Sequence, residues 1–215
     1  MFSKIFPKIH AEGYKFLVIA GVITILFYSF SDFLGLIGLV LTIWVYYFFR
    51  DPERVIINDD NFLVSPADGE VIKVEEVSGP KELNLENKKF KKISIFMNVF
   101  DCHVNRTPCQ GKVEDILYKP GKFFNASLDK ASEENERNFF RIKDNHGNEI
   151  VLVQIAGLVA RRIVCETNKG QELSQGDRVG MIRFGSRADV YYENYEPLVK
   201  VGQKAISGET LLAKK

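Results

Sequence analysis

The sequence has few of the residues and motifs that usually reveal a disulfide framework, a metal site or a nucleotide-binding loop. Its 215 residues include three cysteines and three histidines. The cysteines form no CxxC pair and are odd in number, which argues against a disulfide scaffold and for a reducing compartment. No GxxxxGK(S/T), GxGxxG or HExxH pattern occurs, so neither a phosphate-binding loop nor a metal site is expected. The formal net charge of +1 gives no basic field that would indicate nucleic-acid binding.

Apolar residues, in contrast, are concentrated near the amino terminus. Residues 16–30 and 33–49 form two nearly uncharged runs, broken only at Ser31 and Asp32. One continuous helix would be about 50 Å long, whereas the hydrocarbon layer of a bilayer measures about 30 Å. Two short helices in a hairpin therefore fit better. Full crossing and insertion into one leaflet both stay open, and a buried core hairpin is disfavoured because the segment is apolar all round.

The flanks of this segment predict its orientation. Basic residues lie on both sides: Lys4, Lys8, Lys15, Arg50 and Arg54. By the positive-inside bias, both ends of the hairpin belong on the cytoplasmic face of the cell membrane. We therefore expect a membrane-associating hairpin over residues 1–50 and a second domain over residues 51–215, held at the cytoplasmic face.

The second domain is predicted to be mainly β. Short apolar stretches punctuated by Gly and Pro indicate strands in 61–77 (around a Pro-Ala-Asp-Gly turn), 90–100, 111–123, 176–186 and 208–213. Residues 138–166 are interpreted as two long strands joined at 145–147, and 128–138 as a loop or short exposed helix. The pattern predicts a β-sandwich or barrel. The end of the chain is similar to the half-motif of lipoyl- and biotinyl-carrier barrels, although the Met-Lys hairpin of a carrier is missing.

Two titratable residues stand out in this domain. His103 follows a strand among polar residues, whereas His10 lies in the basic flank and His146 in a turn. His103 is either a satisfied structural histidine or a ligand or proton donor, because histidine titrates near neutral pH. Asp68 is either a turn former that bonds its own backbone or a functional carboxylate.

The dipeptide Gly185–Ser186 is a candidate reactive bond. Glycine adopts strained backbone angles that other residues avoid, and a serine hydroxyl becomes a nucleophile when a base and an oxyanion site support it. Attack of the Ser186 hydroxyl on the preceding carbonyl would give an ester. Elimination and hydrolysis would then leave a pyruvoyl group. On local pattern alone, a simple turn or bulge is the preferred interpretation.

Four motifs change that preference. "SPADG", "FDCHVNRTPCQG", "KASEENERN" and "RFGSRADVYY" follow one another behind the apolar hairpin. In this combination the chain resembles the phosphatidylserine decarboxylase family, in particular its short bacterial branch, over essentially its whole length.

The resemblance implies a self-processing proenzyme. Cleavage between Gly185 and Ser186 would give a large chain (1–185) and a small chain (186–215) that stay together as a heterodimer, and Ser186 would become a covalent pyruvoyl cofactor. The enzyme would decarboxylate membrane phosphatidylserine to phosphatidylethanolamine through a Schiff base, in phospholipid biosynthesis. The resemblance assigns self-processing to Asp68 and decarboxylation to His103. A higher oligomer stays open.

One residue departs from the family pattern. Long-form members carry a second histidine three positions after the first, as base for the self-cleaving serine, and Arg106 occupies that position here. Arginine stays protonated and cannot be an ordinary base. Either His103 serves both steps, or strain at Gly185 and donors to its carbonyl do more of the work. Three arginines are candidates for contacts with the substrate phosphate or carboxylate: Arg161, Arg162 and Arg187.

Two other functions remain as alternatives. In the first, the enzyme decarboxylates a related serine phospholipid, which requires the same chemistry. In the second, the chain is a noncatalytic membrane-anchored adaptor that is similar to a carrier barrel. Such an adaptor would not need the "FGSR" motif.

Overall fold

The computed structural model describes residues 7–127, 131–157, 162–183 and 186–215. The chain divides into two compact units, Met1–Glu53 and Arg54–Lys215. The first unit is helical and the second consists mainly of strands, so the predicted fold class is confirmed.

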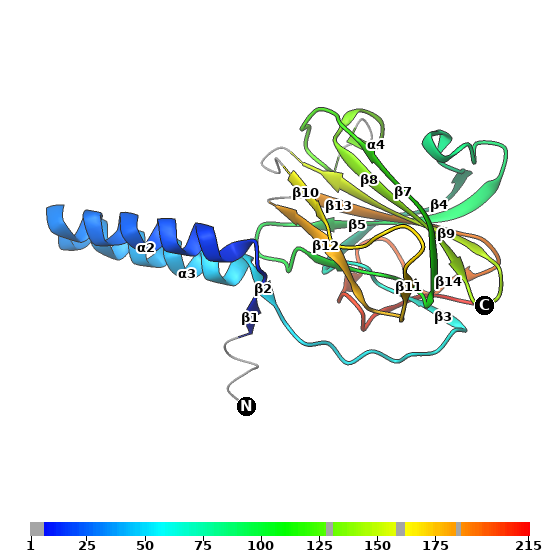
Figure 1. Cartoon of the computed structure of the whole chain (residues 1–215), viewed down its shortest axis with the longest axis horizontal. Helices are drawn as coiled ribbons and strands as arrows, with labels where there is room; N and C mark the ends of the chain where they lie inside the picture. Colours follow the sequence, from blue (N-terminus) through cyan, green and yellow to red (C-terminus); the bar gives the residue numbers. More distant parts are fainter. Residues whose placement is uncertain (1–6, 128–130, 158–161, 184–185) are drawn as a thin grey trace. The chain divides into compact units, whose positions relative to one another are not determined.

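The first unit is a helical hairpin. Helices α2 (Gly13–Phe30) and α3 (Asp32–Phe48) run side by side in opposite directions (Figure 1). Ser31 separates them and caps α3, because its hydroxyl accepts a hydrogen bond from Phe33 N at 3.3 Å. At the open end, strand β1 (Lys8–Ile9) pairs with β2 (Arg50–Asp51) and ties the two ends of the hairpin together.

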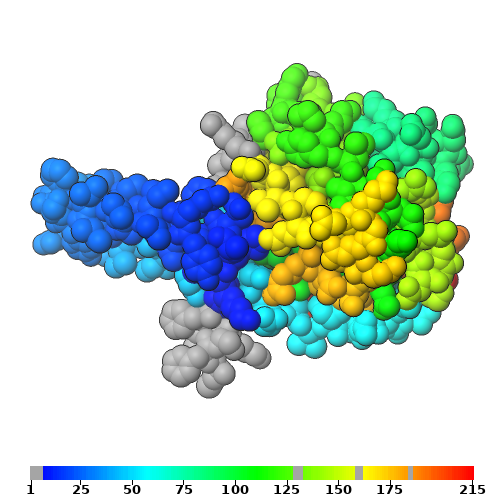
Figure 2. Space-filling view, in the orientation of Figure 1, coloured from blue at the N-terminus to red at the C-terminus, as the bar shows by residue number. Residues whose placement is uncertain are grey.

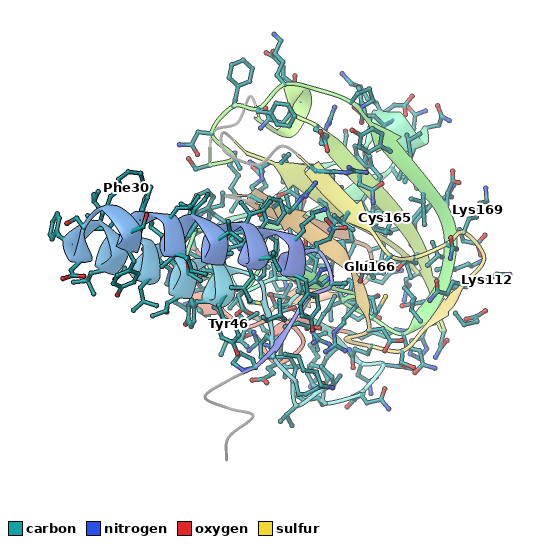
Figure 3. The ribbon with its side chains drawn as sticks, turned by 60° about the vertical axis from the view of Figure 1, so that its left-hand side comes forward. Phe30, Tyr46, Lys112, Cys165, Glu166 and Lys169 are labelled. Carbon is teal, nitrogen blue, oxygen red and sulfur yellow. The ribbon has the colours of Figure 1, made fainter. Side chains whose placement is uncertain are left out.

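Small side chains fill the contact between the helices, while large apolar ones face outward. The hydroxyls of Thr24 and Thr42 lie 2.8 Å apart, and a Cβ atom at Gly38 would come within 3.0 Å of the Thr24 backbone. Phe30 at the tip is 81% exposed, whereas Tyr46 near the open end donates to Pro7 O (Figure 3). Small residues inside and large apolar residues outside are typical of helices that pack in lipid. Of the described helices, α2 is long and apolar enough to cross a membrane.

The second unit contains one large sheet and two small ones (Figure 1). The large sheet has the order β11 (Glu172–Leu173), β7 (Gly111–Lys119), β8 (Arg137–Asp144), β9 (Glu149–Ala156), β13 (Ser186–Tyr192), β5 (Lys89–Met97), β4 (Gly69–Ser78), β15 (Lys204–Ala205). One small sheet contains β10 (Arg162–Cys165), β12 (Arg178–Arg183) and β6 (Val104–Arg106), and the other contains β14 (Glu196–Pro197), β16 (Leu211–Lys214) and β3 (Phe62–Val64). Two short helical segments are η1 (Lys81–Leu83) and α4 (Ala131–Glu134).

The core lies between the large sheet and the small ones. Alternation along β13 sends Ala188 and Val190 into the main apolar cluster, which also takes Leu63 from β3 and Ile182 from β12. Tyr191 points to the opposite face of the sheet and packs against a second cluster, around Phe139. In the view of Figure 2, the yellow and orange residues of β10 to β12 form the centre of this unit's surface, between green residues above and cyan residues below.

Two sequence predictions need correction. Residues 138–166 contain three strands, not two, since β10 is separate from β9 and pairs with β12 in another sheet. In 128–138 the predicted short helix is present as α4, but Asn135 to Asn138 are buried. Asn135 is held inside because its side-chain amide donates to Phe124 O and Ala156 O, at 2.8 and 2.7 Å.

The helix contact predicts a position-specific effect of side-chain size. Gly38→Leu should push α3 away from α2, whereas Gly21→Leu should be harmless, because no atom lies within 4 Å of a Cβ at Gly21. The measurement is oxidative cross-linking of Thr24→Cys with Thr42→Cys in full-length protein in lipid, with the exposed Cys165 replaced by serine. Gly38→Leu should sharply lower the cross-linked yield. Equal yields in the two leucine variants would contradict this packing.

Candidate active site

Ser186 is the first residue of β13, in the middle of the large sheet. It lies opposite Met97 of β5 and Ala156 of β9. The side chain is fully buried, and its hydroxyl contacts Met97 Sδ at 3.7 Å. Gly185, the predicted partner in the reactive bond, lies outside the described residues. The fold thus holds Ser186 from both sides, which is the rigidity that a reacting group needs.

A buried ion pair fixes the residues that follow Ser186. Arg187 binds Asp189 through two hydrogen bonds, Nε to Oδ1 at 2.8 Å and Nη2 to Oδ2 at 2.9 Å, and both side chains are at most 1% exposed. Arg187 Nη1 also donates to Ala126 O at 3.1 Å. These contacts give Arg187 a structural role. Of the other two candidate arginines, Arg162 is exposed at the start of β10 and Arg161 lies outside the described residues.

The "SPADG" loop lies at the same end of the sheet, next to β5. Gly69 has φ +149°, and a Cβ atom there would come within 2.1 Å of Phe96 O, so only glycine allows this close approach. Asp68 precedes it and accepts hydrogen bonds from Arg54 Nη2, at 2.9 and 2.7 Å, and from Ser207 N at 2.8 Å. Asp68 therefore joins the loop to the carboxyl-terminal segment.

His103 is fully buried just before β6. Its backbone carbonyl accepts from Ile182 N at 3.2 Å, which places it beside the end of β12. The ring Nδ1 lies 3.0 Å from Asp101 O. Because a carbonyl oxygen only accepts, Nδ1 must carry a proton, and Nε2 holds the lone pair of the neutral ring. An imidazole in this tautomer can take a proton at Nε2, and the imidazolium so formed can give that proton away again.

The carbonyl of Pro66 connects three of the motifs. It accepts from Arg106 N at 2.9 Å, from Asn105 Nδ2 at 3.4 Å and from Ser207 Oγ at 3.1 Å. The "SPADG" loop, the "DCHVNR" segment and the carboxyl-terminal turn thus meet at one backbone oxygen. Ser186 lies two strands from this loop, across β5.

The Arg106 side chain reaches the connection between β11 and β12. Its Nη1 donates to Gly176 O at 2.8 Å. Side chains alternate along a strand, so His103 and Asn105 share one face of the β6 segment and Arg106 lies on the other. Arg106, the residue that departs from the expected family pattern, is therefore bound to the β11–β12 connection.

Several residues around Ser186 were missed by the sequence predictions. Asn105 contacts Met97 Sδ at 3.5 Å and accepts from Gln154 Nε2 at 2.9 Å, while Asn135 binds the carbonyl of Ala156. Gln154 carried one usable signal, since it is the only polar residue in an apolar run from 150 to 156. Nothing in the local pattern pointed to Asn135 or Met97.

The described His, Cys, Asp and Glu side chains offer neither a metal-binding cluster nor, at Cys109, a reactive buried thiol. Within the described ranges, no three His, Cys, Asp or Glu side chains come together as a metal site. The three cysteines are all described, and none of them forms a disulfide. Burial raises the pKa of the Cys109 thiol, so this sulfur stays protonated and is a poor nucleophile.

Comparison with known proteins agrees with the motifs. A model of the phosphatidylserine decarboxylase family matches residues 41–213. A phosphatidylserine decarboxylase proenzyme from Pelagibacter ubique (strain HTCC1062) is 75% identical over 215 residues, the whole of both chains. Proteins of the same name from Ruegeria pomeroyi and Cereibacter sphaeroides are 54% and 51% identical, covering 95% and 99% of this chain and 94% and 92% of their own.

The chain therefore belongs to the phosphatidylserine decarboxylase family. This membership confirms the predicted family and the predicted enzyme class, a decarboxylase.

The buried ion pair makes a prediction about stability. Asp189→Ala should lower the free energy of unfolding by about 3–5 kcal/mol, because it leaves the Arg187 guanidinium buried without its carboxylate. The double variant Arg187→Met/Asp189→Leu should recover most of that loss, since it removes both charges. Urea unfolding followed by circular dichroism measures both, in a Ser186→Ala background, which removes the proposed self-cleavage as a variable. A double variant as unstable as the single one would contradict the argument.

Proposed function

We propose that this chain is a self-processing phosphatidylserine decarboxylase that converts phosphatidylserine to phosphatidylethanolamine. The observation that carries the proposal is the place of Ser186, buried as the first residue of a strand held on both sides. Cleavage of the bond before it would convert residue 186 into a pyruvoyl group at the start of the small chain, 186–215. The relatives' name, proenzyme, is consistent with such processing.

The surroundings of Ser186 fit a pyruvoyl group. Ala156 and Met97 flank it with small or apolar groups that would not react with a ketone, and no lysine or cysteine is among its cross-strand neighbours. A pyruvoyl group supplies a carbonyl that condenses with the substrate amine and accepts the electron pair released as carbon dioxide leaves. The protein must then supply orientation, exclusion of water and a proton.

His103 is the proposed proton donor at the former α-carbon of the substrate. Its buried ring is oriented by Asp101 O, so the acid–base nitrogen is Nε2. Because Arg106 binds Gly176 O and cannot act as a base, His103 is also the candidate for the proton of Ser186.

Asp68 is proposed to act in self-processing by holding the "SPADG" loop in place. Its bonds to Arg54 and Ser207 N connect the large-chain segment to residues that would belong to the small chain. The two chains would remain a heterodimer, because β13 keeps its neighbours after the cut.

The helical hairpin is proposed to hold the enzyme at the cytoplasmic face of the membrane, where its substrate resides. Each helix is about 26–27 Å long at about 1.5 Å per residue, slightly less than the hydrocarbon layer. Lys15 and Arg50 at the open end favour the cytoplasmic side for both ends. Keeping the site near the bilayer raises the effective concentration of a lipid substrate.

The mass of the purified protein tests the proposed maturation. We expect two pieces, with the smaller one beginning at residue 186 and lighter than the unmodified peptide by one ammonia molecule. It should be blocked to amino-terminal sequencing. Ser186→Ala should stay in one piece and be inactive. A wild-type chain that remains whole and active would overturn the proposal.

Substitution of His103 tests its role in decarboxylation. His103→Ala should lower the decarboxylation rate by about 10²–10⁴, the usual contribution of a general acid. The control His146→Ala, an exposed turn residue, should leave the rate unchanged. The measurement is release of labelled carbon dioxide from phosphatidylserine in mixed micelles, with the cleaved fraction determined in parallel. Full activity in His103→Ala would remove it from the mechanism, and an uncleaved chain would add self-cleavage to its roles.

A further inference from the structure

Three buried side-chain amides form a continuous row that ends beside Ser186. Asn138 Nδ2 donates to Gln154 Oε1 at 3.4 Å, and Gln154 Nε2 donates to Asn105 Oδ1 at 2.9 Å. Asn105 Nδ2 then donates to Met97 Sδ at 3.5 Å and to Pro66 O at 3.4 Å. All three amides are at most 1% exposed.

The row has a fixed direction. An amide accepts at its oxygen and donates at its nitrogen, so the bond from Gln154 occupies the Asn105 oxygen and turns the Asn105 nitrogen toward the sulfur. Pro66 O, which can only accept, requires the same orientation. Gln154, a residue of another strand, and Pro66 O therefore fix the orientation of the Asn105 amide together.

The row ends at the atom that the reacting hydroxyl also contacts. Ser186 Oγ and Asn105 Nδ2 lie within 3.7 Å of the same Met97 sulfur. A thioether is a weak acceptor, so it can hold the Ser186 hydroxyl in one rotamer without binding its proton strongly. The proton stays transferable to a base, and the oxygen lone pairs stay available for attack.

We propose that Asn105 and Gln154 are positioning residues for self-cleavage, which hold Met97 Sδ against the Ser186 hydroxyl and so fix its angle of attack. The inference rests on the proposed function, because it assumes that Ser186 is the nucleophile. It assigns a role in maturation to two side-chain amides that are linked to Ser186 through the Met97 sulfur.

The test compares first-order rates of self-cleavage in newly synthesised full-length chains. Gln154→Leu should slow cleavage about ten- to hundredfold, the usual cost of a misplaced reacting group. The matched control is Gln175→Leu. Gln175 is another buried glutamine, but its amide bonds Phe62 O and Asp59 N, and this variant should cleave at the wild-type rate. Wild-type cleavage in Gln154→Leu would overturn the inference.

Two further measurements keep the result interpretable. Met97→Leu removes the sulfur at nearly constant volume and should also slow cleavage, so it decides the question if Gln154→Leu does not fold. The methyl resonance of labelled Met97 in uncleaved Ser186→Ala protein should shift with Gln154→Leu and not with Gln175→Leu. A general loss of stability would not give this pattern. Absence of cleavage in the wild type would instead refute the proposed function, before any variant is compared.

Discussion

The pairing of β13 with β9 on one side and β5 on the other is the interaction on which the site depends. Its register sets Ser186 opposite Ala156 and Met97 and continues in step to Tyr192. Because side chains alternate along the strand, the same register sends Ser186 to the face of the main core and Arg187 to the opposite face. A slip by one residue would exchange these two environments, and the buried Arg187–Asp189 pair would then lie in the apolar core.

The helical hairpin and the β-rich unit place their apolar side chains in opposite ways. In the β-rich unit, apolar side chains are inside, and the three amides of the row buried among them bind one another. In the hairpin, Thr24 and Gly38 are inside and Phe30 is outside. Water drives the first arrangement through the hydrophobic effect, whereas in lipid close packing and interhelical hydrogen bonds drive the second. The hairpin thus has the packing that is typical of helices in lipid, whereas the β-rich unit has the packing that is typical of a domain in water.

Local sequence predicts the features that depend on local patterns. The apolar runs predict both helices, and the Asn-His-Gly turn at 145–147 predicts the β8–β9 hairpin. The "FGSR" and "DCHVNR" motifs indicate the family, but not which side chains meet. Gln154 and Asn105 are 49 positions apart, and their hydrogen bond is a product of topology. The orientation of Arg106 likewise depends on Gly176, which no pattern near 106 could reveal.

The segment after Ser186 is shared between sheets in a way that affects the lifetime of the enzyme. From this segment β13 and β15 enter the large sheet, while β16 joins β3 in a small one. Once the chain is cut, refolding becomes an encounter of two separate molecules, which costs translational and rotational freedom. An uncut chain can search for its fold as one molecule, whereas a protein cut before Ser186, as proposed, could not. Its persistence would then be governed by how slowly it unfolds, so that maturation makes the native state a kinetic trap.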